Sequence, residues 1–347
     1  MTQLSRRFGR RSLAAGAALL ALGLVAGALQ FSSTAKADSP PQCSDPVTSA
    51  PQGPATVSMA ATADFGNVLV VGSGDYAGCS LYLLTSDQLH RLAGSNYACS
   101  DAPDAIPGSP ACDTVLWPAL LTDGAPIAGA GVNAKLLGTV TRTDLPGLGV
   151  PSVQQVTYAG QPLNRIFLDE DVGESEGAHL FDPVTSPTGI WYLVNARGTP
   201  ATGPAMLQLE TAPVARTGSA QTVLAAAMDQ DFSLTSGAFP FPVYTLSRGR
   251  GSAFGPMGHC DDLCAQYWPP VLTVGRPQAA AGVDAHALGT VLREDGTQQV
   301  TYRGRPLYLS ANDAVIPPLP YNGAAEGING AGAQTIWGTF NTIPPMH

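Results

Sequence analysis

WPALLTDGAPIAGAGVNAKLLGTVTRTD runs from Trp117 to Asp144, and WPPVLTVGRPQAAAGVDAHALGTVLRED runs from Trp268 to Asp295. The two stretches align without a gap and are identical at 17 of their 28 positions. Identity of this extent at a fixed offset within one chain indicates an internal duplication. The sequence therefore predicts two tandem, related units.

A second matching run follows an insertion in the first unit. Residues 145–151 have no counterpart in the second unit, and beyond them Gln154–Leu163 matches Gln298–Leu307 at eight of ten positions. In the second unit Asp295-Gly296 joins the two β-rich runs, as in a hairpin turn. We expect the insertion to be a surface loop and each unit to contain a three-stranded meander.

The composition favours a mainly β fold with short helical turns. The chain has 39 Gly and 30 Pro and little long helical periodicity. Each unit is expected to be a sandwich, a barrel or part of a small propeller, since short strands fit all three. The expected divisions are a signal peptide (1–37), an N-terminal arm (38–54), β-rich repeat unit 1 (55–200), a linker (201–220) and β-rich repeat unit 2 (221–347).

The N-terminus predicts export. Four arginines precede an uncharged apolar run from Leu13 to Leu29, and Ala35-Lys36-Ala37 has the form of an A-x-A cleavage site. We expect cleavage after Ala37 and a location in the periplasm or outside the cell. No later stretch is long and apolar enough to span a bilayer, so no stable membrane insertion is expected after cleavage.

The mature chain is strongly acidic. Removing five basic residues with the signal peptide leaves 12 of the 17 Lys and Arg against 26 Asp and Glu, a net charge near −14. Such a charge repels phosphate backbones and anionic lipid surfaces. Nucleic acid and membrane surfaces are therefore not expected as partners.

Six cysteines follow the predicted cleavage site. An even number in an oxidising compartment favours three disulfides, although composition alone allows fifteen pairings. Cys260 and Cys264 would lie one turn apart on a short helix, at a distance that a disulfide accepts. Their counterparts in the first unit are thirteen residues apart, and elimination leaves a third pair. The candidate disulfide residues are Cys43, Cys79, Cys99, Cys112, Cys260 and Cys264.

The same region offers copper as an alternative. Reduced Cys260 and Cys264, together with His259 and Met257, would provide the soft thiolate, thioether and imidazole ligands that copper accepts. A periplasmic copper-binding or electron-transfer protein is therefore an alternative function. It requires free thiols.

Four aromatic residues recur between the units, namely Trp117, Trp268, Tyr158 and Tyr302. They would either line a groove for a sugar or peptide or pack in the core, and core packing is the commoner use of such residues.

An acidic run offers a calcium alternative. Asp169-Glu170-Asp171, with Glu174 and Glu176, would supply oxygen ligands, but without the spacing of an EF-hand. An exposed acidic loop is the simpler interpretation.

The chain resembles a bacterial family of secreted repeats and predicted lipoproteins of unknown function, marked by a Tyr-x-aromatic-x-x-Asp motif. The resemblance rests on Tyr82–Asp87, on Cys260–Pro270, on Tyr308 with Asp313 and on both Gln-Val-Thr-Tyr-x-Gly-x-Pro-Leu runs, and it covers most of the mature chain. Leu84 and Ser310 occupy the aromatic position of the motif. The resemblance implies export and a repeated architecture, and it assigns no activity.

No familiar catalytic motif occurs. The chain contains no H-E-x-x-H, no G-x-S-x-G and no G-x-x-x-x-G-K-[ST]. We therefore predict no catalytic residue and no cofactor. The expected function is that of an exported, non-catalytic envelope protein that binds a cell-envelope component or a small ligand. A secreted hydrolase without a recognisable motif is a further alternative.

Overall fold

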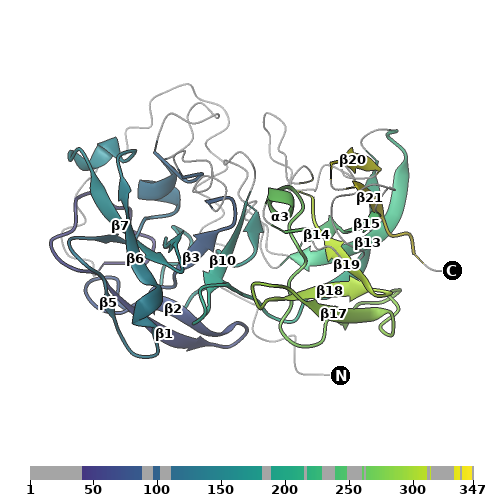
Figure 1. Ribbon diagram of the computed structural model, residues 1–347, viewed down its shortest axis with the longest axis horizontal. Coiled ribbons are helices and arrows are strands. Elements are labelled where there is room, and N and C mark those ends of the chain that lie inside the picture. The colour runs from purple at the N-terminus through teal and green to yellow at the C-terminus, as the bar shows by residue number, and fades with distance from the viewer. Residues whose placement is uncertain are drawn as a thin grey trace.

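The computed structural model describes residues 41–87, 97–101, 111–181, 189–214, 217–228, 239–247, 260–261, 263–310, 313, 332–336 and 338–345. Within these ranges the chain is mainly β with short helical turns, as the sequence predicts. The strands form five sheets, and none of these sheets closes into a barrel in the described part. Figure 1 shows the first half of the chain, in purple to teal, beside the second half, in green to yellow.

The first half contributes three sheets, with strand orders β2-β1-β5, β11-β10-β3 and β4-β7-β6. Strand β9 adds to β10, and β8 adds to β7, so β6, β7 and β8 form the predicted meander. These strands are β1 (Thr56–Thr62), β2 (Gly66–Val71), β3 (Tyr82–Leu84), β4 (Leu121–Thr122), β5 (Ile127–Ala128), β6 (Leu137–Arg142), β7 (Val153–Tyr158), β8 (Gln161–Pro162), β9 (Leu180–Phe181), β10 (Ile190–Val194) and β11 (Pro200–Ala201).

The second half contributes a four-stranded sheet of order β14-β13-β12-β16 and a six-stranded sheet of order β17-β18-β19-β15-β21-β20. Its meander, β17-β18-β19, is confirmed as well. These strands are β12 (Met206–Pro213), β13 (Ala220–Met228), β14 (Phe239–Pro242), β15 (Tyr244–Ser247), β16 (Gln278–Ala279), β17 (Leu288–Leu292), β18 (Gln298–Tyr302), β19 (Arg305–Tyr308), β20 (Ala333–Thr335) and β21 (Gly338–Thr342).

An unusual parallel contact occurs in both halves. β5 lies parallel to β1, and β16 lies parallel to β12, although each of these sheets is otherwise antiparallel. The Ile127 N–H donates to Ala55 O at 2.8 Å, and the Gln278 N–H donates to Ala205 O at 2.8 Å. Ile127 and Gln278, which the sequence alignment pairs, therefore make corresponding parallel contacts.

The stretch 201–220, expected to be a linker, contains a long strand. β12 pairs with all of Ala220–Ala227 on β13 and also with β16. Leu207 is fully buried, and Leu209 is partly buried on the same face. The Pro, Thr and Ala content of 201–220 suggested a joint, but pairing with β13 decides the conformation. The second half of the fold thus begins before residue 206.

The insertion and the N-terminal arm both make buried contacts. Leu145 and Leu148, from the inserted residues, are buried against Val153, and Val47 of the arm packs on the same small cluster. The described part of the arm is further fixed by the disulfide of Cys43. The other five inserted residues are exposed, so the insertion is a surface loop, as predicted, and its two leucines pack inward.

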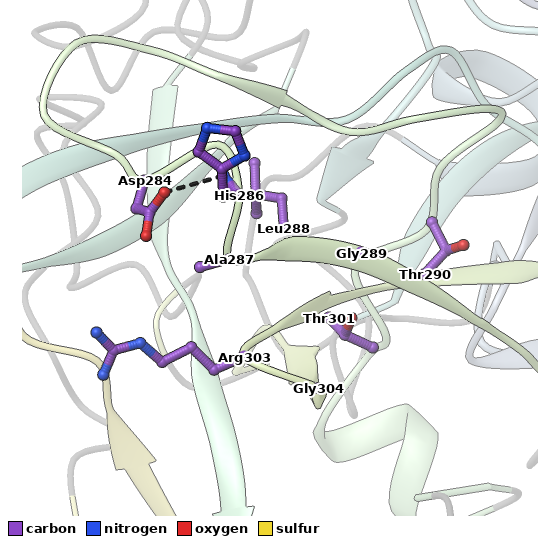
Figure 2. A pocket seen from close by; sticks show the side chains of 9 residues that line it. All are labelled: Asp284, His286, Ala287, Leu288, Gly289, Thr290, Thr301, Arg303 and Gly304. Atoms are coloured by element: carbon purple, nitrogen blue, oxygen red, sulfur yellow. Dashed lines mark hydrogen bonds between the residues drawn. The ribbon is translucent and has the colours of Figure 1, made fainter.

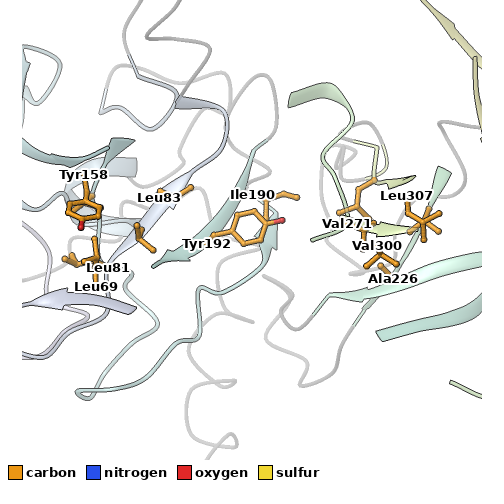
Figure 3. Packing of buried hydrophobic residues seen from close by; sticks show 14 of the residues in the cluster. Leu69, Leu81, Leu83, Tyr158, Ile190, Tyr192, Ala226, Val271, Val300 and Leu307 are labelled. Carbon is orange, nitrogen blue, oxygen red and sulfur yellow. The ribbon is translucent and has the colours of Figure 1, made fainter. Parts of the chain in front are cut away.

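One cluster of buried residues runs through both halves of the chain. Figure 3 shows Ile190 and Tyr192 of β10 between Leu81 on one side and Leu307 on the other. Burial of this apolar surface is the main stabilising contribution at the boundary. The two halves therefore share a core.

In the described part of the chain, no helix is both long and apolar enough to cross a membrane.

Candidate functional site

A buried tyrosine–aspartate pair occurs in each half. The Tyr82 hydroxyl on β3 donates to Asp169 Oδ2 at 2.8 Å, and the Tyr244 hydroxyl on β15 donates to Asp313 Oδ2 at 2.7 Å. Burial raises the pKa of Asp169 to about 7, because the Tyr82 and Glu176 hydrogen bonds offset only part of the desolvation. These pairs connect residues far apart in the sequence.

The Tyr and the Asp of each Tyr-x-aromatic-x-x-Asp motif form hydrogen bonds with different partners and not with each other. Asp87 does not pair with Tyr82 but accepts the Ala98 N–H at 2.8 Å. Burial, and then the nearby Asp113 carboxylate, raise the pKa of Asp87 to about 7. Likewise, the Tyr308 hydroxyl accepts the Cys260 N–H at 3.2 Å. Asp313 accepts its hydrogen bond from Tyr244 and not from Tyr308. The motif residues of the described part thus connect strands and loops inside the fold.

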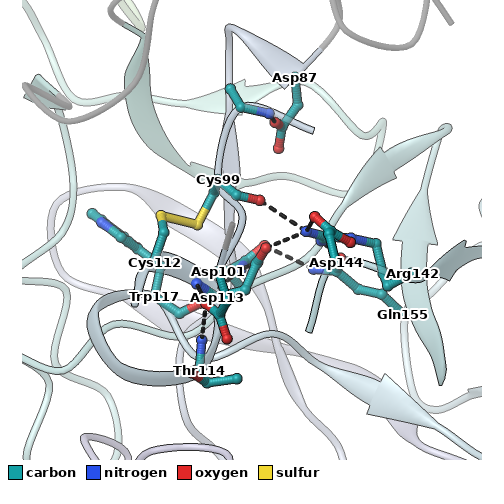
Figure 4. Close-up of polar contacts among 12 residues, drawn as sticks. Asp87, Cys99, Asp101, Cys112, Asp113, Thr114, Trp117, Arg142, Asp144 and Gln155 are labelled. Carbon is teal, nitrogen blue, oxygen red and sulfur yellow. Dashed lines mark hydrogen bonds and ion pairs between the residues drawn. A yellow bond between two sulfur atoms is a disulfide. The ribbon is translucent and has the colours of Figure 1, made fainter. Parts of the chain in front are cut away.

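A buried arginine lies beside the Cys99–Cys112 disulfide, as Figure 4 shows. Arg142 pairs with Asp113, donates through Nε to Asp144 Oδ1 at 2.8 Å and reaches Cys99 O at 2.9 Å. Burial lowers the pKa of Arg142, but the adjacent carboxylates outweigh this effect and raise it overall. Burial raises the pKa of Asp113 to about 6, with Arg142 opposing the change.

The second half repeats this arrangement without the two hydrogen bonds that Arg142 makes to Asp144. Arg293 donates to Gln299 Oε1 at 2.9 Å and to Asp261 Oδ1 at 2.5 Å. Asp295, the counterpart of Asp144, instead accepts from the backbone N–H and the hydroxyl of Thr297 in the hairpin turn. The buried Nε of Arg293 consequently has no hydrogen-bond partner. Both arginine networks are structural.

The aromatic residues considered for a ligand groove are buried. Trp117, Trp268, Tyr158 and Tyr302 have exposed fractions of 1%, 3%, 0% and 7%. Trp117 stacks on Trp191 with ring centroids 3.8 Å apart. Their rings are therefore core elements and present no open face to a ligand.

The same stacking recurs in the second half, where Trp268 lies 3.6 Å from Phe340. Phe340 faces Leu246 across the β15–β21 pair, as Trp191 faces Leu84 across β3–β10. Phe340 therefore takes the place of Trp191, and the neighbouring Trp337 lies outside the described residues.

All six cysteines are disulfide-bonded, as Cys43–Cys79, Cys99–Cys112 and Cys260–Cys264. In this oxidised form Cys260 and Cys264 have no thiolate to offer copper. His259 and Met257, the other two proposed ligands, lie outside the described residues. The copper alternative thus requires reduction of this disulfide.

The acidic run considered for calcium is tied into its own loop. Glu174 Oε2 accepts the backbone N–H groups of Glu170 and Asp171, at 2.7 and 3.0 Å. Asp169 is buried and accepts the Glu176 N–H at 2.8 Å. Among the described residues, no group of three or more His, Cys, Asp or Glu side chains is placed to hold a metal ion.

A surface hollow of about 510 Å³ lies beside β17 and β18 (Figure 2). Asp284 and His286, from the loop before β17, form one wall, and Arg303 of the β18–β19 turn forms another. Gly289 and Thr301 also line the hollow. The hollow is shallow and open to solvent, and it brings charged, hydroxyl and imidazole side chains together on one surface.

A comparison of the two aligned stretches, which a search for motifs does not make, gives an indication of this hollow in the sequence. Its charged residues Asp284 and Arg303 correspond to Asn133 and Ala159 in the first unit. A position that is charged in one of two matching stretches and uncharged in the other indicates a feature that belongs to one stretch alone.

No family model, curated protein or solved structure matches this chain.

Proposed function

We propose that this chain is an exported, non-catalytic envelope protein in which two related β-rich units form a scaffold that binds a ligand. The observation that carries the proposal is that most of the distinctive polar side chains are buried in contacts within the fold, whereas a few charged ones face solvent together. The tyrosine–aspartate pairs, the arginine networks and the disulfides stabilise the fold, whereas the hollow beside β17 presents charged groups to solvent.

The proposal of two related units rests on matched contacts. Trp117 and Trp268 occupy aligned positions and have the same kind of stacking partner, and Arg142 and Arg293 also align and bind corresponding glutamines. Contacts that recur together with sequence identity support duplication of a whole unit. The resemblance to the secreted-repeat family, also a proposal, agrees with this arrangement.

Export is supported by the cysteines and the N-terminal sequence. Disulfides persist in oxidising compartments and are rare in the cytosol. Residues 1–37, which lie outside the described ranges, have the composition of a cleaved signal peptide.

The proposal is tested on the protein purified from the medium or periplasm of an expressing bacterium. Intact mass should show an N-terminus at Asp38 and three disulfides. The protein is then titrated with soluble peptidoglycan fragments, wall polysaccharides and small envelope metabolites, and each mixture is checked for product by mass spectrometry. Saturable binding without turnover is expected. Turnover of any component, or no binding across the panel, would overturn the proposal.

A further inference from the structure

The hollow beside β17 presents two opposite charges that are not paired with each other. Asp284 is partly buried on one wall, and Arg303 is exposed on another. Figure 2 shows both side chains projecting toward the same side of the hollow. No ion pair within the described ranges joins them, although the complementary charges line one space.

A local hydrogen bond orients the Asp284 carboxylate, and a backbone bond positions the turn that carries Arg303. Asp284 Oδ1 accepts the His286 N–H at 2.9 Å, which orients the carboxylate at the start of the loop. Arg303 N–H donates to Ala287 O at 2.7 Å, and its guanidinium lies 5.9 Å from the ring centroid of Tyr302. The two walls are thus tied together by backbone bonds.

The floor of the hollow depends on a glycine. Gly289 faces Thr301 across the β17–β18 pair, so their side-chain positions share one face of the sheet. A Cβ atom at position 289 would lie 3.0 Å from Thr301 Oγ1, tighter than an ordinary contact. The glycine therefore avoids crowding the threonine hydroxyl, which both donates and accepts hydrogen bonds and which lines the hollow from a residue that is only 6% exposed.

The first half has the same frame, with Asn133 in place of Asp284, Ala159 in place of Arg303 and Lys135 in place of His286. Gly138 faces Thr157, and Asn133 Oδ1 accepts the Lys135 N–H at 3.1 Å, just as Asp284 does with His286. Ala159, the counterpart of Arg303, has the same φ of 51°. The frame therefore tolerates Asn and Ala, and the charges of the second half are not needed for its folding.

We infer that this hollow binds a small zwitterion, such as a free amino acid or a short peptide with both termini in reach. Arg303 would bind the carboxylate and Asp284 the ammonium group, and the Thr301 hydroxyl would hydrogen-bond the body of the molecule. A ligand with a single charge can pair with only one of these two side chains and leaves the other without a partner. The inference rests on the proposed ligand-binding function and specifies its substrate class.

The test uses the mature, disulfide-bonded protein and a panel of glycine, alanine, alanyl-alanine, acetate and methylammonium. Binding is followed by NMR chemical-shift changes of backbone amides at constant ionic strength. The zwitterions should bind more tightly than either single-charge ion. Since exposed ion pairs contribute up to about 1 kcal/mol, the loss of one charge should weaken binding about fivefold.

The variants Asp284→Asn and Arg303→Ala copy residues of the first half, so both should fold. Each should reduce zwitterion binding to the level of a single-charge ion, and the double variant should abolish it. Asp123→Asn and Arg276→Ala remove exposed charges elsewhere and serve as controls with unchanged affinity.

Equal binding of acetate and glycine, or unchanged affinity in the double variant, would overturn the zwitterion site. So would the absence of any shift near Gly289 and Thr301. If the double variant still binds a ligand found in the envelope panel, the inference falls and the proposed function stands. If the panel and the zwitterions both fail, the two fall together.

Discussion

Asp169→Asn should stabilise the protein, and the gain should grow as the pH rises from 4.5 to 8. Asp169 is 1% exposed, and its pKa of about 7 in the fold lies above the ordinary value of 3.8. A carboxyl group with a raised pKa contributes most to stability below pH 4, and this contribution is lost as the pH rises through 7. The difference between the two pKa values corresponds to a cost of about 4 kcal/mol at pH 8.

Asparagine avoids this cost because it does not ionise. Its amide oxygen can accept the Glu176 N–H, and its N–H group can donate to the Tyr82 hydroxyl, which both donates and accepts. The amide therefore resembles the neutral carboxyl group in its hydrogen bonds. The variant should be more stable than the parent by about 1 kcal/mol at pH 4.5 and by about 4 kcal/mol at pH 8.

The measurement is urea unfolding with the disulfides intact, followed by tryptophan fluorescence from pH 4.5 to 8.5. The parent should lose about 1.4 kcal/mol per pH unit relative to the variant between pH 5 and 7. Asp171→Asn removes an exposed carboxylate two residues away and should give a curve parallel to the parent. Parallel curves for Asp169→Asn would refute the argument that burial suppresses ionisation at this position.

Three further predictions concern the scaffold, and each is checked by urea unfolding at pH 6. Arg142→Lys should lower the free energy of unfolding by about 3 kcal/mol, and Arg293→Lys by about half as much. The reason is that Arg142 uses its Nε in a hydrogen bond and Arg293 does not. Equal losses in the two variants would contradict this. Trp117→Ala should cost about 4 kcal/mol through lost stacking and a cavity, and a loss below 1 kcal/mol would show that the site collapses freely. Replacing Cys43 and Cys79 by Ala should cost about 4 kcal/mol, since their disulfide closes a loop of 36 residues; an unchanged midpoint would show that the arm is held without it.

Features that depend on local sequence could be predicted. The mainly β class and the meanders follow from turn residues between short β-rich runs, and the Asp295-Gly296 turn forms where the sequence places it. The three disulfides match the pairs suggested by spacing and by elimination.

Features that depend on distant partners could not be predicted. Tyr82 and Asp169 are 87 residues apart, and no periodicity connects them. β12 has a linker-like composition and becomes a strand because β13 and β16 supply its hydrogen bonds. The hollow beside β17 arises from segments brought together by the hairpin, so Arg303 and Asp284 have no shared motif in the sequence.

The core that passes through Ile190 and Tyr192 has a consequence for dividing the protein. A cut near residue 203 would expose apolar side chains of this cluster on each fragment. We therefore expect fragments made for crystallography to need both halves, added in trans if not on one chain.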